Sequence, residues 1–480
     1  MALYVQDDWR VSDRLTVNAG LRYDVEFPRR VDGNKMNSFD PLAINPVSNT
    51  PGVVTFAGIN GTPERAFATD WNNFGPRLGF AYRLRGKGDT VLRGGAGILY
   101  GQTVSNTIGD TASLGFSTSA SYSVAQAEIQ SALQLRNGFP AATRQPLTAA
   151  FGAVPVGQRV NTSVAFFNPK QVAPISYQYN LDIQHEIAKD LLLEIGYIGN
   201  VSHHLTANDF SLNQVPPQLM TSGNAQLVRP FPQFNNVTWI NPSIGNSTYH
   251  GGFIRTEKRM SSRLSFLAHY TFSKFLDDVE AANEYGTTGS YMDAYHRNLD
   301  KGLSGSDVPH RLVGSVLYDV GKFNGNRFVS GVLSGWKVGL LETIESGPPF
   351  TIITSANTTN AFPAGPLRPN LVHDPSLPSD QRTIDRWFDT TAFANPAPLT
   401  FGNAPRSVLR GAPSITTDGT LEKSFQITEA WKLDVRGEFY NLFNHAVFNI
   451  PGFTLGAADF GVVSSARAPR TAQFAIRLAF

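Results

Sequence analysis

The residues of this sequence that could do chemistry are histidines, carboxylates and glycines near the ends of extended segments. His203 and His204 stand side by side with Asp209 close behind them, and these side-chain types can bind a metal ion. Loop histidines without regularly spaced partners more often face solvent, so we predict no metal site. The run Gly94-Gly95-Ala96-Gly97 resembles a phosphate-binding loop but lacks the third glycine of the dinucleotide fingerprint. The run alternates as a strand does, and we expect no nucleotide and no other cofactor.

A second group of candidates lies in one long connecting segment. Asp277, Asp278, Glu280 and Glu284 offer the oxygen ligands that calcium prefers, but the regular ligand spacing of a calcium loop is absent. We therefore favour a solvated acidic loop. The same segment also holds side chains that are common in recognition surfaces and could either contact a ligand or pack the loop: Tyr291, Tyr295, His296 and Arg297.

No set of residues predicts an enzyme. The chain has no cysteine, which excludes disulfides, thiolate metal sites and cysteine nucleophiles. It has no G-x-S-x-G motif, and no carboxylate spacing singles out an acid and a base. With 40 Lys and Arg against 38 Asp and Glu, the net charge of +2 gives no basic footprint for nucleic acid. We expect no catalytic residue and no nucleic-acid partner.

The elements that must position these residues are strands. From Leu15 to Val25 the odd positions are apolar, whereas the even positions are polar or glycine. A period of two places the two sets on opposite faces of a strand. Only residues 12–14 separate this segment from a similar one, so the pair predicts a tight hairpin. The same alternation predicts thirteen strands in all, near 2–11, 15–25, 74–84, 90–100, 175–188, 191–201, 248–260, 264–273, 310–320, 332–345 (the least regular), 415–428, 430–442 and 470–480.

Strand length and loop length together indicate a membrane barrel. Strands of globular proteins usually have about 5–6 residues, whereas a barrel strand that crosses a membrane needs about 9–11. Most of the predicted strands have ten to fourteen residues. Short turns alternate with long segments, and short periplasmic turns with long external loops are typical of outer-membrane barrels. We therefore predict an all-β, antiparallel transmembrane barrel in outer-membrane lipid rather than a soluble β protein. The long segments lie near 26–73, 101–174, 202–247, 274–309 and 346–414.

The parity of the strands predicts that the sequence is part of a longer barrel. The last strand follows a long external loop and therefore ends in the periplasm, and counting back thirteen strands makes the first one run inward from outside. A complete bacterial barrel has an even number of strands. We expect an odd number of strands to be missing before Met1, where no signal-peptide pattern is present.

Short motifs that resemble a known family are spread over nearly the whole chain. They are Gln6-Asp7-Asp8-Trp9-Arg10, Leu21-Arg22-Tyr23-Asp24, Tyr270-Thr271-Phe272-Ser273-Lys274 with Asp277-Asp278, Ser346-Gly347-Pro348-Pro349-Phe350, Arg368-Pro369-Asn370, Gly437-Glu438-Phe439-Tyr440-Asn441-Leu442-Phe443-Asn444-His445, Phe460-Gly461 and Pro469-Arg470-Thr471-Ala472-Gln473-Phe474. On these motifs the chain resembles the TonB-dependent outer-membrane receptors and, within them, the Oar-like transporters. The resemblance implies a plugged barrel of about 22 strands. Residues 1–480 would then be a partial barrel domain that lacks the signal peptide, the plug and the first strands.

The function that the resemblance implies is an energised receptor-transporter in the cell outer membrane of a Gram-negative-type bacterium. It would take up or export a large extracellular ligand that the sequence does not identify. TonB, with ExbB and ExbD, would supply the energy through the missing N-terminal part. Two alternatives stay open: a passive porin-like or structural barrel, and a secreted β-rich adhesin or enzyme.

Aromatic residues near strand ends are expected at the membrane interfaces. These are Trp9, Tyr23, Tyr100, Tyr270, Trp336 and Trp431. In the last strand, Phe474, Ile476, Leu478 and Phe480 share one face, and the chain stops on the aromatic residue. This pattern resembles the C-terminal signal that the barrel assembly machinery recognises. The four residues could also simply face lipid, and both interpretations can hold together.

Overall fold

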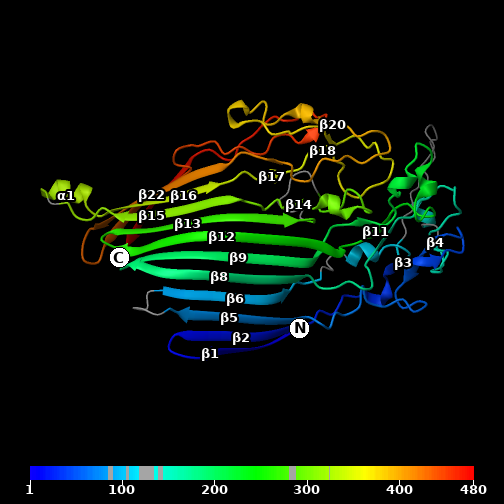
Figure 1. Ribbon diagram of the computed structural model, residues 1–480, viewed down its shortest axis with the longest axis horizontal. Helices are drawn as coiled ribbons and strands as arrows, with labels where there is room; N and C mark the ends of the chain where they lie inside the picture. The colour runs from blue at the N-terminus through cyan, green and yellow to red at the C-terminus, as the bar shows by residue number, and fades with distance from the viewer. Residues whose placement is uncertain (85–89, 104–107, 118–133, 139–143, 280–287, 324) are drawn as a thin grey trace.

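The computed structural model describes residues 1–480 except 85–89, 104–107, 118–133, 139–143, 280–287 and 324. Thirteen long strands form one antiparallel meander, in which each strand pairs with the next one along the sheet (Figure 1). All thirteen predicted strands are confirmed. They are β1 (Ala2–Arg10), β2 (Leu15–Asp24), β5 (Phe74–Arg83), β6 (Thr90–Tyr100), β8 (Ile175–Ala188), β9 (Leu191–Thr206), β12 (Ser243–Ser261), β13 (Leu264–Asp277), β15 (His310–Asp319), β16 (Trp336–Glu345), β22 (Ser414–Gln426), β23 (Lys432–Tyr440) and β25 (Thr471–Ala479).

Two kinds of strand end differ from the prediction. β9, β12 and β13 continue further toward the long loops, because β12 pairs with β9 as far as Ser243 opposite Thr206 and with β13 as far as Ser247 opposite Asp277. β16 begins at Trp336 rather than near residue 332, because the residues before it close a short helix, α1 (Arg327–Leu333). Among the described residues, β1 pairs with β2 alone and β25 with β23 alone. The described sheet is therefore open, and a closed barrel of about 22 strands stays a prediction.

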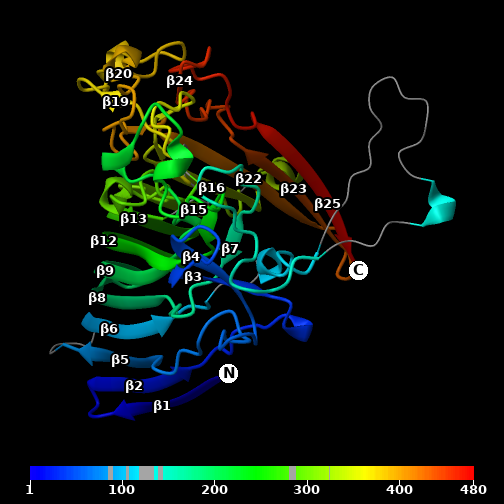
Figure 2. The same ribbon diagram turned by 90° about the vertical axis from the view of Figure 1, so that its right-hand side faces the viewer.

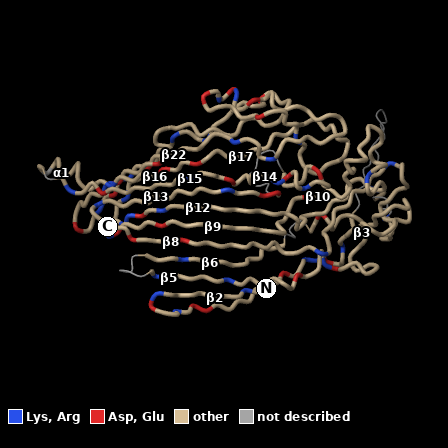
Figure 3. The backbone as a smooth tube through the Cα atoms, in the orientation of Figure 1, with Lys and Arg blue, Asp and Glu red and all other residues tan. Residues whose placement is uncertain are grey.

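The strands curve from β1 round to β25, with the long loops gathered at one end (Figures 1 and 2). At the other end, short connections join β1 to β2, β5 to β6, β8 to β9, β12 to β13, β15 to β16 and β22 to β23 (Figure 3). In the part of the chain that the structure describes, no helix is both long and apolar enough to span a membrane.

Register places the apolar and polar residues of each strand on opposite faces. Val435 pairs with Ile476, while Arg436 pairs with Ala475. Arg436 lies 2.5 Å from Glu438, and both belong to the polar set. Side chains on the apolar set stand clear of the protein, with Phe474 and Ile476 exposed over 74% and 75% of their surface. The alternation predicted from the sequence therefore describes the two faces of this sheet.

The long loops contain small elements of their own. The short strands are β3 (Asn37–Ile44), β4 (Pro51–Phe56), β7 (Val164–Phe166), β10 (Phe210–Ser211), β11 (Val237–Trp239), β14 (Gly302–Leu303), β17 (Pro349–Phe350), β18 (Ile353–Thr354), β19 (Asn370–Leu371), β20 (Phe393–Ala394), β21 (Leu409–Arg410) and β24 (Thr454–Leu455). Single turns of 3₁₀-helix lie at Asp32–Asn34, Ile108–Thr111, Leu135–Asn137, Pro217–Leu219, Ala225–Val228, Arg297–Asp300, Ser379–Gln381 and Thr390–Ala392.

Single-cysteine labels test which face meets lipid, because the chain contains no cysteine of its own. We expect spin labels at Val435 and Phe439 to report lipid, and labels at Arg436 and Glu438 to report water. The physical reason is the period of two, by which a slip of one residue would move every side chain to the other face. Accessibility to oxygen and to a water-soluble nickel complex measures this, and the opposite pattern would show that the faces are reversed.

The terminal strand generates a second prediction. Phe480 stacks on Trp431 with ring centroids 5.2 Å apart, close to the short-turn end. A charge at this level costs only about 0–1 kcal/mol, whereas an arginine near mid-membrane costs about 2–4 kcal/mol. We expect deletion of Phe480 to lower outer-membrane yield more than this stability cost explains, because assembly itself is impaired. Pulse-chase assembly kinetics measure the effect, with Arg477→Gln on the polar face as the tolerated control. Normal kinetics without Phe480 would leave the four residues with a lipid-facing role only.

Candidate functional site

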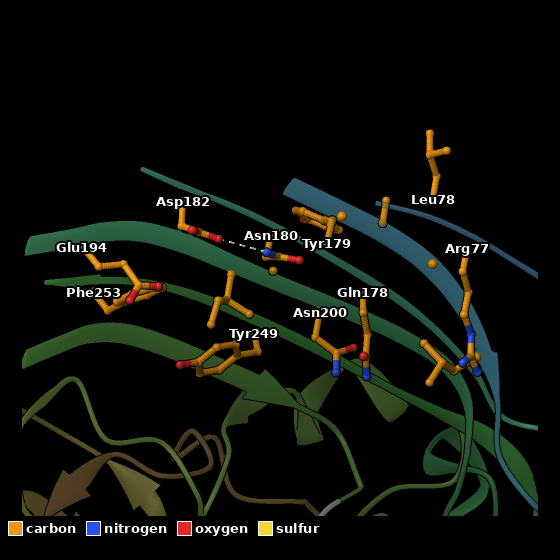
Figure 4. A pocket seen from close by; sticks show the side chains of 16 residues that line it. Arg77, Leu78, Gln178, Tyr179, Asn180, Asp182, Glu194, Asn200, Tyr249 and Phe253 are labelled. Atoms are coloured by element: carbon orange, nitrogen blue, oxygen red, sulfur yellow. Dashed lines mark hydrogen bonds between the residues drawn. The ribbon is translucent and has the colours of Figure 1, made fainter. Parts of the chain in front are cut away.

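A cavity of about 780 Å³ lies on the polar face of the sheet, over β5, β6, β8, β9 and β12 (Figure 4). Asn180 donates a hydrogen bond to Asp182 at 3.4 Å. Ser176 and Ser202 donate to the side-chain oxygen of Asn200 at 2.8 and 3.0 Å. The arrangement offers amide, carboxylate and guanidinium groups to a hydrophilic solute. The polar side chains along it are Arg77, Gln178, Asn180, Asp182, Glu194 and Asn200.

A charged cluster continues this wall toward the middle of the sheet. Arg255 lies 3.1 Å from Glu194 and 2.5 Å from Glu257, so one guanidinium bridges two carboxylates on neighbouring strands. A second cavity of about 380 Å³ adjoins the cluster and is lined by His269 and Thr271 among others. These groups make the wall hydrophilic and hold one another in fixed positions.

The glycine run on β6 has a packing role. A Cβ atom added to Gly94 would lie 2.7 Å from the ring of Phe80, so a larger residue there would require this ring to shift. Gly95 and Gly97 face the other way and line the large cavity. The run is part of β6, as the alternation predicted.

Both histidines of the pair belong to β9 rather than to a loop. His203 lies with its Nδ1 atom 2.8 Å from the side-chain oxygen of Asn246 on β12. Asp209 is exposed at the surface, but desolvation by the surrounding chain, together with nearby Asp110, raises the pKa of its carboxyl. Within the described ranges, no group of three or more His, Asp or Glu side chains is arranged to hold a metal ion.

At the long-loop end, the connecting segments form a cap with hydrophobic cores of its own. One core joins the first three long loops. Phe39 and Phe56 come from the first loop, Phe166 from the second, and Phe234 and Val237 from the third. A second core joins the loop between β16 and β22 to the loop between β23 and β25. The residues that form it or pack against it include Phe350, Phe388, Phe393, Leu409, Phe453 and Phe460. Burial of such aromatic side chains stabilises a fixed arrangement of the loops.

Three Arg–Asp ion pairs tie the loop that follows β13 to the loop that precedes β22. Arg406 lies 2.5 Å from Asp277, with both side chains at most 3% exposed. Arg368 lies 2.5 Å from Asp300, and Arg410 pairs with Asp307. The guanidinium of Arg406 also donates to the backbone oxygens of Asp277 and Asp300 at 2.9 and 2.8 Å.

This finding corrects the expectation of a solvated acidic loop. Asp277 is buried in an ion pair, and Asp278 accepts hydrogen bonds from the backbone and side chain of Asn246 at 2.6 and 3.1 Å. Burial nevertheless raises the pKa of the Asp278 carboxyl. The physical reason for the error is that the basic partner, Arg406, is 129 residues further along the chain. Glu280 and Glu284 lie outside the described residues.

The four candidate ligand contacts occupy different environments. Tyr291 is 2% exposed and packs edge-on against Phe210, with the Arg297 guanidinium 5.7 Å from the centre of the tyrosine ring. Burial raises the pKa of Tyr291 well above its usual range. Tyr291 therefore packs the loop in this structure.

Tyr295 and His296 lie nearer the surface. Tyr295 is 45% exposed and donates to the backbone oxygen of Gln214 at 3.2 Å. His296 lies 2.6 Å from Asp293, which is buried and accepts a hydrogen bond from the Gln214 amide at 2.7 Å. Ligand contact stays a prediction for these residues, and Tyr295 and His296 are the pair best placed for it.

Sequence patterns gave no reason to select Gln214 and Asp293, although they hold Tyr295 and His296 in place. Gln214 accepts from the backbone N–H of Ala294 at 2.9 Å and is fully buried. Its partners are about eighty residues away, which a period of two or a local motif cannot reveal. By contrast, Gln178, Asn180 and Asp182 of the polar wall stand at even positions of the strand predicted at 175–188, so the alternation predicts their face.

An antiparallel meander of long strands, with one apolar face, one polar face and long loops at a single end, defines an outer-membrane β-barrel protein. A family model described as the outer membrane beta barrel domain matches residues 1–473. The chain belongs to this family, and its place is the cell outer membrane.

Solved structures of outer-membrane proteins resemble the chain at low identity. The ferripyoverdine receptor of Pseudomonas aeruginosa aligns with a TM-score of 0.44 and 10% identity, over 100% of this chain and 38% of that one. The outer membrane transporter YddB from Escherichia coli aligns with a TM-score of 0.44 and 11% identity, over 97% of this chain and 45% of that one. The FrpB iron transporter from Neisseria meningitidis aligns with a TM-score of 0.43 and 10% identity, over 99% of this chain and 45% of that one. The chain spans less than half the length of each structure. A comparison with curated proteins found no match.

The ion pairs of the cap generate a third prediction. Replacing Arg406 by Met leaves the buried Asp277 carboxylate without its guanidinium, a loss of about 3–5 kcal/mol for a buried pair. We expect the cap to open more readily, with faster hydrogen exchange at the loop amides around residues 300 and 406. The control is Arg311→Met, because Arg311 pairs with Glu345 at 2.8 Å but is 56% exposed, which makes its pair worth about 0–1 kcal/mol. Equal effects of the two substitutions would contradict the role assigned to burial.

Proposed function

We propose that this chain is the barrel part of an energised outer-membrane receptor-transporter and that it has no enzymatic role. Its long loops would bind a large extracellular ligand, and the polar inner wall would line the route that the ligand takes. TonB, with ExbB and ExbD, would supply the work through a plug domain in the lumen. We further propose that residues 1–480 are a partial barrel domain, which additional strands complete between β25 and β1.

The observation that carries this proposal is the packed cap. Phe56, Phe234, Phe350 and Phe388 are at most 2% exposed, and all four belong to connecting segments rather than to the spanning strands. A chain that only encloses a pore has no need of such cores, since its wall is stable through strand pairing. External loops in a fixed arrangement can bind one ligand selectively, and a hydrophilic wall beneath them can line the path by which that ligand moves inward. The motifs that resemble TonB-dependent receptors, including Gln6-Asp7-Asp8-Trp9-Arg10, support the same function.

The polar wall supports transport of a hydrophilic ligand. Asn180, Asp182 and Asn200 present hydrogen-bonding groups in one cavity, and Arg255 with Glu194 adds balanced charge beside it. A wall of mixed charge does not select strongly for cations or anions. Selectivity would then reside in the cap, where Tyr295 and His296 reach the surface.

The alternatives predict different behaviour. A passive porin-like barrel would keep an open lumen and would bind no TonB. A secreted adhesin or enzyme would be released without detergent, which the family and the exposed apolar face of the sheet disfavour.

Two measurements on the intact protein test the proposal. We expect almost no steady conductance in planar lipid bilayers, because a plug fills the lumen, together with specific binding of the purified periplasmic domain of TonB. Deletion of the TonB-binding segment is the matched control, and it should abolish binding without opening the channel. Stable open-channel steps and no binding of TonB would favour the passive barrel instead.

A further inference from the structure

One connection at the short-turn end differs from the other described ones. Between β15 and β16, residues 320–335 contain the helix α1, which extends beyond the ends of the strands (Figure 1). Asn326 caps its first turn by accepting a hydrogen bond from the backbone N–H of Val329 at 2.9 Å. Gly335 then adopts a φ of +76°, a left-handed conformation that glycine accepts without strain, and it returns the chain to β16.

The C-terminal end of α1 is bonded to the apolar face of the sheet. The indole of Trp336 donates to the backbone oxygen of Val332 at 2.7 Å. The ammonium group of Lys423 donates to the same oxygen at 2.6 Å and also to the backbone oxygen of Gly331. Trp336 pairs with Lys423 in the register of β16 and β22, so both side chains point to the face that carries Leu340 and Leu421.

Lys423 explains why a helix is placed here. A lysine on a lipid-facing surface needs polar partners for its ammonium group. Lys423 is only 2% exposed, and its nitrogen lies 5.1 Å from the ring centre of Trp336 and 4.8 Å from that of Phe425. The carbonyl groups at the end of α1 and the two aromatic rings therefore satisfy the cation and cover it from the lipid side.

The rest of α1 presents apolar side chains with no protein cover. Phe328 is 78% exposed, and Val329, Val332 and Leu333 are 38%, 47% and 45% exposed. Val329, Val332 and Leu333 follow Phe328 by one, four and five residues, which places all four side chains on one side of the helix. Phe323, just before the helix, is 44% exposed beside the exposed Lys322. Such a patch marks a surface that binds something apolar.

We propose that α1 lies in the plane of the periplasmic leaflet of the outer membrane, with its apolar arc in the boundary between phospholipid headgroups and acyl chains. Short turns are periplasmic in this family of barrels, which fixes the leaflet. The patch adjoins the lipid-facing surface, because Trp336 on that surface donates a hydrogen bond to Val332 of the helix. Helices of this kind insert their apolar face about 5–10 Å into the headgroup boundary, and Lys322 supplies a positive charge for lipid phosphate. The inference holds for any ligand that the barrel transports.

Spin labels on single cysteines test the proposal in the intact barrel protein, reconstituted into vesicles of phosphatidylethanolamine and phosphatidylglycerol. The variants are Phe328→Cys and Val332→Cys on the helix, with Ser12→Cys in another short turn as the matched control. Power saturation compares collisions with oxygen, which concentrates in lipid, and with a water-soluble nickel complex. We expect oxygen to dominate at both helix positions and the nickel complex to dominate at the control.

Each other outcome overturns the proposal. Helix labels that respond like the control would place α1 in water, and labels shielded from both reagents would place it against a protein. Heat-modifiable migration confirms folding before each measurement, and Val329→Cys replaces any helix variant that does not fold. The vesicles contain no other protein, so labels shielded from both reagents would show that α1 packs against the barrel protein itself.

Discussion

In a lipid bilayer, a backbone amide has no water to bond to, so every amide of a spanning strand must pair with a neighbouring strand. This constraint explains the meander of thirteen strands, in which each strand pairs with the next from β1 to β25. It also explains why the wall is a single layer with two different faces. One face must suit acyl chains, and the other is free to be polar, as the cavity beside Asn180 and Asp182 illustrates.

A single-layer wall has no hydrophobic core between layers, which moves the burial of apolar side chains elsewhere. The largest fully buried side chains, among them Phe167, Phe234 and Ile352, all lie in the connecting segments. The loops at one end therefore behave as a small globular layer that is anchored to the strand ends. Asp277, the last residue of β13, shows the connection directly, because its ion pair with Arg406 joins the wall to the cap.

The wall could be predicted from the sequence and most of the cap could not. Strand positions and faces follow from a period of two, which is local, and this period alone places Val435 and Arg436 on opposite faces of β23. The cap depends on partners far apart in sequence, such as Arg406 with Asp277 and Gln214 with Asp293. Carboxylates in an acidic run look solvated until a distant arginine is known. The polar wall was visible as alternation, but nothing in that pattern singles out Asn180 from any other even position.

Exceptions to the alternation carry more information than the alternation itself. Glu342 and Lys423 both stand on the apolar face, where an isolated charge is costly. Each has a polar partner nearby. Glu342 accepts a hydrogen bond from Thr417 on the adjacent strand at 2.5 Å, and Lys423 donates to a backbone oxygen at the end of α1. Strand pairing alone would leave the ammonium group of Lys423 facing lipid, so the residue and the helix require each other. A charged residue on the lipid face is therefore a reason to look for the polar partner that the neighbouring strand or turn supplies.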